Sequence, residues 1–306
     1  MEAGRRFLRH EYRVSMTEAA NCPTWLRLAS TTLHRLPFRR GKTRLARWLA
    51  RRVKPGGLVV TTRDRIRIEL PSLNDPIAHE LLAHGRYEES VDGVILKHLL
   101  VGGTFVDVGA NVGVFTCRMA RHVGASGRVV AIEASPVIGP ILERNVARNR
   151  LANVQVVRQA ATDRAGTLDF YTAPEHSMGM GSLAKQFDQA PVSVVARTLE
   201  AILDELNIGK VDVIKVDVEG FEKQVFAGAH PRLTGRRRPH IVFEFLDWAE
   251  QRAGLQPGDA QRELLNLGYN LHTIDEWKPV VTPLPQPLTT GSAMILAVPQ
   301  ELTSPA

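Results

Sequence analysis

The chain has 306 residues, of which 44% are hydrophobic and 6% aromatic, enough to bury one large core. It has only two cysteines, Cys22 and Cys117, and no run approaching 18 apolar residues. This composition excludes a disulfide framework, a cysteine zinc site and a membrane-spanning helix. We therefore expect a cytoplasmic protein, and the first 30 residues lack the apolar segment of a signal peptide.

Charge is distributed unevenly, although the net formal charge is +7. Residues 1–55 contain 14 Lys and Arg against three Glu, a balance of +11, whereas the remainder contains 25 basic and 29 acidic residues, a balance of −4. We expect a basic, partly helical extension over residues 1–55, a hairpin and helices over 56–103, and the main domain over 104–300. The mildly acidic main domain argues against a nucleic-acid groove built into it.

Residues 39–54 of the extension predict a basic amphipathic helix. Its apolar residues recur at helical spacing beside a basic stripe: Leu45, Trp48, Leu49 and Val53 beside Arg44, Arg47, Arg51 and Lys54. Two interpretations remain open. The helix packs its apolar stripe on the main domain as a cap, or it docks reversibly on an anionic membrane, at the inner face.

The segment over residues 56–103 leads into the main domain. Alternating apolar residues in Leu58-Val59-Val60 and in Arg65–Ile68 predict a short hairpin. Leu81–Leu100 is broadly helical in pattern, and Gly102-Gly103 closes the region.

From Thr104 onward, apolar strand patterns alternate with helical patterns, which is typical of parallel βαβ units. Predicted strands cover Thr104–Val108, Arg128–Ile132, Val154–Arg158, Val211–Val216, His240–Phe245, Tyr269–Ile274 and Ala293–Val298. Predicted helices cover Val114–His122, Ile138–Asn149, Leu199–Leu206 and Phe221–Ala227, with one more after Asp259. We expect an α/β fold with a mostly parallel seven-stranded sheet and an antiparallel C-terminal strand. The closing hairpin should place an antiparallel edge on this sheet.

An interruption follows the third predicted strand. Leu168–Tyr171 and Val192–Ala196 predict extra strands around a loop, residues 172–190, that is rich in Gly, Ser, Met and Pro. Loops of this length in a compact domain are often functional lids.

The strongest local pattern is an apolar strand that runs into a glycine turn and opens a helix, from Phe105 to Thr116. Gly109 is expected to let the backbone approach a ligand, and Gly113 to let the first helical turn pack on the sheet. Dinucleotide dehydrogenases prefer G-x-G-x-x-G, whereas residues 109–113 read Gly-Ala-Asn-Val-Gly. Asp107 disfavours a pyrophosphate and suits the ammonium group of S-adenosyl-L-methionine.

Residues at the ends of the next strands complete the predicted cofactor site. Glu133 closes the second strand at a spacing suited to ribose hydroxyls, and small residues with an acid follow the third strand, where an adenine would lie. The candidate cofactor-binding residues are Asp107, Gly109, Ala110, Asn111, Gly113, Glu133, Ala134, Ala161 and Asp163.

Ionisable residues leave the fourth strand of the main domain. Strand alternation places Lys215, Asp217 and Glu219 on one side if the extended form persists. Methyl transfer to a hydroxyl needs a group that removes the proton, and the candidate catalytic residues are Asp217, Glu219, Lys215, Glu244 and His176. Structural alternatives are a Lys215–carboxylate ion pair and a solvent-exposed His176. Asp217 and Glu244 end adjacent strands, so a divalent metal is conceivable, but two carboxylates alone do not support one.

These blocks resemble the FkbM-type methyltransferase family over about residues 65–298. The resemblance rests on Val106–Gly113, Ile132–Pro136, Gly181-Ser182-Leu183, Arg197-Thr198-Leu199, Ile214–Glu222 and Val242-Phe243-Glu244. It implies a Rossmann-like class I fold that methylates hydroxyl groups on sugars, glycolipids or polyketide-type metabolites. It also implies that Asp217, Glu219 and Glu222 form an acidic block beside the cofactor. Phe221 departs from the family pattern, where a small residue is common.

The sequence leaves three candidate functions for the chain. The first is O-methylation of a small-molecule or lipid-linked saccharide acceptor. The second is N-methylation, which on nucleic acid would place an Asn/Asp-Pro-Pro-aromatic run where the chain has Asp217-Val218-Glu219-Gly220. The third is a cofactor-fold binding protein without turnover, which the intact glycine loop and acidic strand end disfavour.

Overall fold

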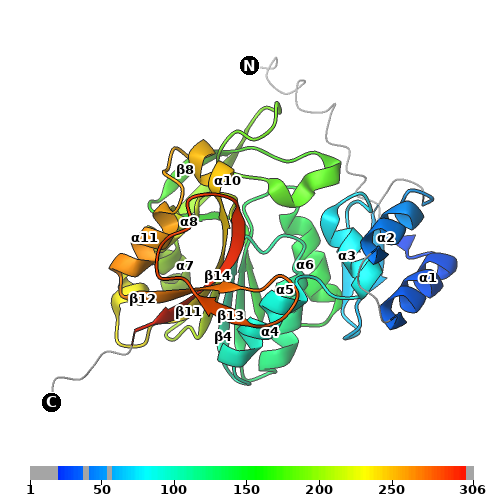
Figure 1. The fold of residues 1–306 in the computed structure, drawn as a ribbon, viewed down its shortest axis with the longest axis horizontal. Coiled ribbons are helices and arrows are strands. Elements are labelled where there is room, and N and C mark those ends of the chain that lie inside the picture. The colour runs from blue at the N-terminus through cyan, green and yellow to red at the C-terminus, as the bar shows by residue number, and fades with distance from the viewer. Residues whose placement is uncertain (1–19, 37–40, 54–56, 301–306) are drawn as a thin grey trace.

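A computed structural model of the chain describes residues 20–36, 41–53 and 57–300. A sheet with helices on both faces forms the centre, and a smaller group of N-terminal elements packs at one end (Figure 1). Within the described ranges, no helix has the length and apolar character needed to cross a membrane.

The central sheet has the order β13-β12-β14-β11-β10-β4-β5-β6. Its strands are β4 (Thr104–Val108), β5 (Arg128–Ile132), β6 (Val154–Val157), β10 (Val213–Val216), β11 (His240–Leu246), β12 (Tyr269–Ile274), β13 (Val281–Pro283) and β14 (Ser292–Pro299). The pairs β6–β5–β4–β10–β11 are parallel. All seven predicted strands are therefore confirmed, and the short β13 adds an eighth.

The C-terminal strand is antiparallel, as expected. β14 inserts between β11 and β12 and pairs antiparallel with both. The closing strands β13, β12 and β14 thus form an antiparallel edge on an otherwise parallel sheet, as expected.

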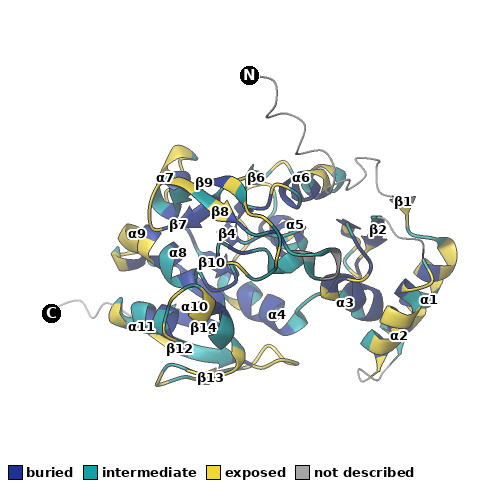
Figure 2. Cartoon of the chain, turned by 90° about the horizontal axis from the view of Figure 1, so that it is seen from above, coloured by how far each residue is buried: buried dark blue, intermediate teal, exposed yellow. Residues whose placement is uncertain are grey.

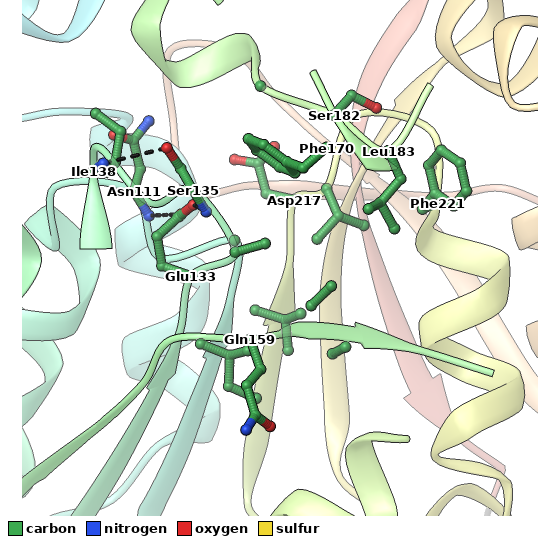
Figure 3. Close-up of a pocket in the computed structure, with 18 of the residues that line it drawn as sticks. Asn111, Glu133, Ser135, Ile138, Gln159, Phe170, Ser182, Leu183, Asp217 and Phe221 are labelled. Atoms are coloured by element: carbon green, nitrogen blue, oxygen red, sulfur yellow. Dashed lines mark hydrogen bonds between the residues drawn. The ribbon is translucent and has the colours of Figure 1, made fainter. Parts of the chain in front are cut away.

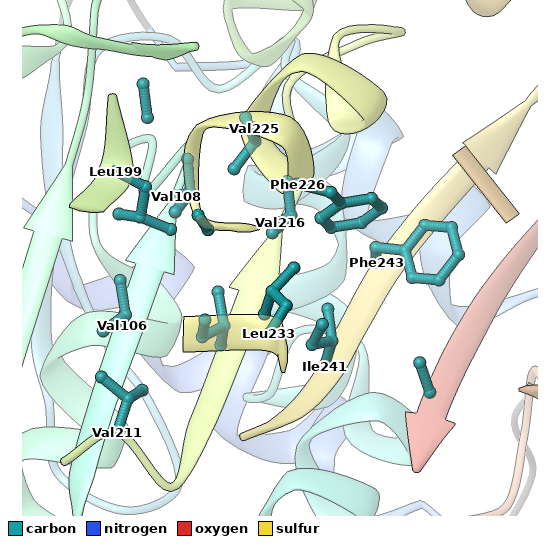
Figure 4. Packing of buried hydrophobic residues seen from close by; sticks show 14 of the residues in the cluster. Val106, Val108, Leu199, Val211, Val216, Val225, Phe226, Leu233, Ile241 and Phe243 are labelled. Atoms are coloured by element: carbon teal, nitrogen blue, oxygen red, sulfur yellow. The ribbon is translucent and has the colours of Figure 1, made fainter. Parts of the chain in front are cut away.

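Alternate residues of each strand pack against different helical layers. Val106 and Val108 of β4 join one core, whereas Phe105, the residue before Val106, joins another. The first core is built with α7 (Leu199–Glu205), α8 (Glu222–Gly228), α9 (His230–Thr234) and α11 (Asp259–Asn266), and the second with α4 (Glu89–His98) and α5 (Val114–Val123). Phe226 of α8 meets Phe243 of β11 edge to face at 5.3 Å in the first core (Figure 4).

A small second sheet follows β6 and supports the pocket described below. It has the order β7-β9-β8, with β7 (Ala160–Thr162), β8 (Gly166–Phe170) and β9 (Val192–Thr198). Thr198 ends β9 and caps α7, because its side chain accepts a hydrogen bond from Ala201 N. The intervening loop carries a short 3₁₀ segment, η2 (Glu175–Met180).

The N-terminal elements are a small sheet and three helices. The predicted hairpin is formed by β2 (Leu58–Thr61) and β3 (Arg67–Leu70), and β1 (Ala20–Asn21) adds in parallel to β2. Helices α1 (Thr24–Arg35) and α2 (Lys42–Ala50) pack on α3 (Pro76–His84). The predicted 39–54 helix is confirmed over α2. Residues 51–53 form a turn and a bend after it, and residues 39–40 and Lys54 lie outside the described residues.

The broadly helical pattern over Leu81–Leu100 corresponds to the end of α3 and to α4 (Glu89–His98), with a break between them. Gly85, with φ of 69°, ends α3 in the left-handed conformation, and α4 starts anew at Glu89. A glycine takes this conformation without strain and is a common helix terminator. The break brings the turn at Tyr87 and Glu88 to the carboxyl ends of the strands, as the electrostatic contacts of Glu88 with Lys215 and Asp217 show.

Candidate functional site

The glycine turn after β4 is shaped by the chain's own backbone. Gly109 has φ of +77°, and its N–H donates to Ile132 O at 2.9 Å. A Cβ added at Gly109 would lie 1.8 Å from the carbonyl oxygen of Asp217, a clash that no side chain tolerates. The glycine is therefore needed where β4 passes the end of β10. Gly109 also lines a pocket, so the expected approach of a ligand to its backbone stays a prediction.

The rest of the turn prepares the start of α5. Asn111 has φ of 51°, and its Oδ1 accepts from Val112 N at 2.7 Å. A Cβ on Gly113 would lie 2.5 Å from Leu142 Cδ1 of α6 (Gly139–Arg148). Gly113 thus permits close packing against this helix, where packing on the sheet was expected.

Glu133, at the end of β5, joins the glycine turn to the next loop. One of its carboxylate oxygens accepts from Asn111 N at 2.8 Å and the other from Ser135 N at 2.7 Å. Burial raises the pKa of Glu133 to about 7, against the lowering effect of these two hydrogen bonds. Each carboxylate oxygen can accept a second bond, so Glu133 retains accepting capacity toward the pocket that it lines (Figure 3).

A pocket with about 660 Å³ of empty space, which includes space open to solvent, lies across the ends of β4, β5 and β10. Glu133 and Asn111 form a polar side, Ala161 and Phe170 contribute an apolar side, and Asp217 lies toward β10 (Figure 3). The arrangement offers polar acceptors and an apolar slot in one cavity.

Asp107 does not line this pocket. Its side chain is buried, with one oxygen accepting from Thr116 Oγ1 at 2.6 Å and the other, Oδ1, without a hydrogen-bond partner. Burial raises the pKa of Asp107, and the positive charge of Lys215 opposes that rise. Asp107 thus lies behind the glycine turn, close enough to Lys215 to interact electrostatically.

Lys215 on β10 forms the ion pair that the sequence left open. Its ammonium group donates to Asp217 Oδ2 at 2.8 Å, and Lys215 is only 2% exposed. Burial alone would lower the pKa of Lys215, but the charges of Asp217, Asp107 and Glu88 raise it overall. Lys215 is therefore a fixed positive charge beneath the pocket.

Three carboxylates gather just beyond this ion pair. Asp217, Glu219 and Glu244 each offer an oxygen, and these atoms lie within 4.8 Å of one another. Burial and the charge of Asp217 raise the pKa of Glu219 to about 8 and that of Glu244 to about 10. Like charges at this distance repel, so each carboxylate disfavours ionisation of its neighbours, while Lys215 pairs with Asp217.

Local backbone geometry creates the cluster. β10 ends at Val216, and Glu219 has φ of 56°, so the extended form does not persist through Glu219. Glu222 stabilises this turn because its carboxylate accepts from Val218 N at 3.0 Å and Gly220 N at 3.1 Å. The carboxylate of Glu222 is thus occupied by hydrogen bonds to the backbone of the acidic block.

The loop over residues 172–190 is fastened to the same turn. Ser182 Oγ donates to Glu219 O at 3.0 Å, and the backbones of Ser182 and Tyr171 pair as an isolated bridge. Leu183, next to Ser182, lines the pocket. His176 lies on η2, but its side chain is outside the described part of the chain.

Among the sequence candidates, Gly109, Asn111, Glu133, Ala134, Ala161 and Asp217 line the pocket. Ala110, Gly113 and Asp163 do not line it, and Asp163 is exposed. Sequence reasoning missed Gln159, Phe170 and Glu88. No signal marked the first two, whereas Gly85 inside a helical pattern could have revealed the turn that positions Glu88.

Phe221 also lines the pocket. The sequence left open whether this residue fills core space or trims the acceptor site. Because Phe221 is one of the residues that line the pocket, its ring borders the cavity.

Comparison with known proteins gives a family match. The family described as the methyltransferase FkbM domain matches residues 107–271. This range begins at Asp107 within β4 and ends at Leu271 within β12, so it contains β5, β6, β10 and β11 whole and part of β4 and β12.

Two curated relatives are similar over part of the chain. Methyltransferase sdnD of Sordaria araneosa is 28% identical over 153 residues, covering 40% of this chain and 59% of that protein. The 31-O-demethyl-FK506 methyltransferase FkbM of Streptomyces tacrolimicus is 29% identical over 172 residues, covering 45% of this chain and 64% of that protein. The chain thus spans about three fifths of the length of these relatives.

Among solved structures, the precorrin-6y C5,15-methyltransferase of Geobacter metallireducens is similar at a TM-score of 0.40 and 14% identity. The match covers 69% of this chain and 87% of that one. Because this likeness is distant, the fold rests on the strand order described above.

Proposed function

This chain belongs to the methyltransferase FkbM domain family, and we propose that it transfers a methyl group from S-adenosyl-L-methionine to a hydroxyl of a sugar, glycolipid or polyketide-type metabolite. The observation that carries the proposal is one cavity that joins the Gly109 turn and Glu133 to Asp217. A nucleoside cofactor and a proton acceptor would thus meet in the same space.

The residues of the pocket fit this cofactor. Glu133 retains accepting capacity for ribose hydroxyls, and Ala161 with Phe170 supplies an apolar slot for a base. Asp107 does not line the pocket, and its unpartnered oxygen is buried behind the turn, so we assign it no direct contact with the cofactor. The cofactor, when bound, supplies an electrophilic methyl group, so the chain's residues need only align an acceptor and accept its proton.

Asp217 is the residue that we assign to the proton. It lines the pocket, and Lys215 holds its carboxylate in place at 2.8 Å. Glu219 and Glu244 stand next to it, so a proton taken from the acceptor hydroxyl can be shared within the cluster. A carboxylate in this position serves as the base late in the displacement.

A divalent cation is the second way in which the same carboxylates can act. The oxygens of Asp217, Glu219 and Glu244 lie within 4.8 Å of one another, and oxygen ligands are those that Mg²⁺ and Mn²⁺ prefer. Manganese binding followed by electron paramagnetic resonance tests this role without turnover. If manganese binding is as strong in the Glu219→Gln variant as in the wild type, the metal role is excluded. The exposed Asp204→Asn is the control.

The acceptor class follows from the family resemblance and from one relative. That relative is named as a 31-O-demethyl-FK506 methyltransferase, a name that denotes an oxygen acceptor on a polyketide-type metabolite. A lipid-linked saccharide at the cytoplasmic face of a membrane is the other acceptor that we propose, with residues 39–54 as the membrane contact. The described part of that segment is α2 (Lys42–Ala50).

Labelled methyl transfer tests the reaction. The purified chain is incubated with methyl-labelled cofactor and either a glycolipid or a polar-metabolite extract. We expect label in an alkali-stable ether and equimolar S-adenosylhomocysteine. Label on nitrogen would support the N-methyltransferase alternative, and tight cofactor binding without any transfer would support a binding protein.

A further inference from the structure

The two N-terminal helices expose large apolar side chains that nothing in the described chain covers. Trp25 and Leu28 of α1 are 45% and 63% exposed, and Leu45 and Trp48 of α2 are 43% and 51% exposed. Each pair has i,i+3 spacing, so its members are neighbours on one face of a helix. The outer sides of α1 and α2 therefore carry apolar residues at one end of the molecule (Figure 2).

These side chains are not an unfilled part of the core. Leu26 and Leu33 of α1 are buried, and α2 packs inward through Ala46 and Ala50. The stripe of Leu45 and Trp48 was expected to cap the main domain or to meet a membrane. Because both residues remain about half exposed, the cap interpretation is not borne out for them.

Positive charge surrounds the apolar side chains. Residues 19–63 contain 11 Lys and Arg and no Asp or Glu. The arginines of the two helices, Arg27, Arg35, Arg44 and Arg47, are exposed. None of these four arginines forms an ion pair with a carboxylate of the residues that the structure describes. The guanidinium of Arg52 lies 3.1 Å from the centre of the Trp48 ring, so a cation and an aromatic ring share one site.

We propose that α1 and α2 together form a docking surface for an anionic lipid membrane. Trp and Leu side chains enter the boundary between headgroups and acyl chains, while arginines meet lipid phosphates. Charge complementarity selects this partner, because the surface has no carboxylate to repel anionic lipid. A nucleic acid would engage the arginines but would leave Leu28 and Leu45 exposed to water.

The position of the surface gives it a consequence for the pocket. α1 and α2 pack on α3, and Ile77 of α3 lies beside Gly179 of the loop over the pocket, about 4.0 Å from an ideal Cβ there. Docking would thus hold this loop near a lipid-linked acceptor. That consequence rests on the proposed function, whereas the docking itself does not.

Co-sedimentation of the full chain with vesicles tests the proposal without turnover. We expect binding to phosphatidylcholine mixed with phosphatidylglycerol, little binding to phosphatidylcholine alone, and weakening with added salt. The double variant Trp25→Ser with Trp48→Ser should bind at least about tenfold more weakly. The matched control is Trp277→Ser, another exposed tryptophan, at 55%, between β12 and β13.

A charge pair of variants separates the two contributions. Arg44→Gln with Arg47→Gln should reduce binding to anionic vesicles, whereas Arg164→Gln with Arg236→Gln, both exposed elsewhere, should not. Circular dichroism verifies that each variant folds. Equal binding to neutral vesicles, unchanged binding by the tryptophan variant, or binding to a DNA duplex but not to vesicles would overturn the proposal. Failure of methyl transfer would leave these results unaffected.

Discussion

The pocket and the two N-terminal helices differ in the sign and the burial of their charged residues. At the pocket, Asp217, Glu219 and Glu244 lie close together and partly buried, with Lys215 as their neighbouring cation. On α1 and α2 the arginines are exposed, and no acid occurs from residue 19 to residue 63.

The difference shows where charge is costly. Exposed arginines remain hydrated and cost the fold little. Buried carboxylates repel one another and resist ionisation, as the raised pKa values of Glu219 and Glu244 show. We propose an association for the first group and chemistry for the second, and the variants below test that contrast.

The largest expected effect is on Asp217. Asp217→Asn keeps the shape of the side chain but removes the proton acceptor, so labelled methyl transfer should fall by about 1,000-fold. Affinity for S-adenosylhomocysteine, measured by calorimetry, should change only a few-fold. Asp204→Asn, an exposed carboxylate on α7, is the control. Full transfer by the Asp217 variant would remove it from the mechanism.

Glu133 should matter next, and for binding rather than turnover. Glu133→Ala removes a buried acceptor from the pocket and two hydrogen bonds that hold the adjoining turns. Affinity for S-adenosylhomocysteine should fall by about 100-fold, or roughly 2.7 kcal/mol. Asp163→Asn, exposed and outside the pocket, should bind normally. Equal loss in both variants would show that the pocket is misassigned.

Glu69 tests whether the N-terminal elements are stably joined to the main domain. It lies on β3, and its carboxylate accepts from Arg144 at 2.7 Å and from Arg148 at 3.0 Å. Glu69→Gln should lower the free energy of unfolding by about 2 kcal/mol at pH 7. This is less than for a fully buried pair, because the Arg144 side chain is 45% exposed. Glu143→Gln, an exposed residue of α6, is the control.

The ion pairs of Glu69 with Arg144 and Arg148 also predict how the free energy of unfolding depends on pH. Burial would raise the pKa of Glu69, but the hydrogen bonds and charges of Arg144 and Arg148 lower it overall. The stabilisation is thus present above the unfolded pKa of about 4.3 and is lost as the pH falls through the lower folded value. Denaturant unfolding of wild type and Glu69→Gln should converge in acid. A gap that persists below both pKa values would contradict the assignment.

The smallest effect is expected at Trp48. Because its ring is 51% exposed, Trp48→Ser should change the free energy of unfolding by less than about 0.5 kcal/mol, while vesicle binding falls. Thermal unfolding without lipid checks this. A loss of several kcal/mol would mean that the ring supports the fold, and the contrast between the two regions would weaken.

The sequence by itself determined the elements of the main domain and the position of the glycine turn. The predicted bounds of β4 and β5, Thr104–Val108 and Arg128–Ile132, agree with the structure. Runs of buried apolar residues and a glycine turn are local signals, because burial on both faces of a strand is written in consecutive residues.

Only the tertiary structure decided which residues meet. It placed β14 between β11 and β12, buried Asp107 behind the turn, and brought Glu88 into the electrostatic neighbourhood of Lys215. It also left Trp25 and Trp48 uncovered. Local periodicity indicates whether one face of a helix or strand is apolar or charged. It does not indicate what covers that face, because the covering residues come from distant parts of the chain.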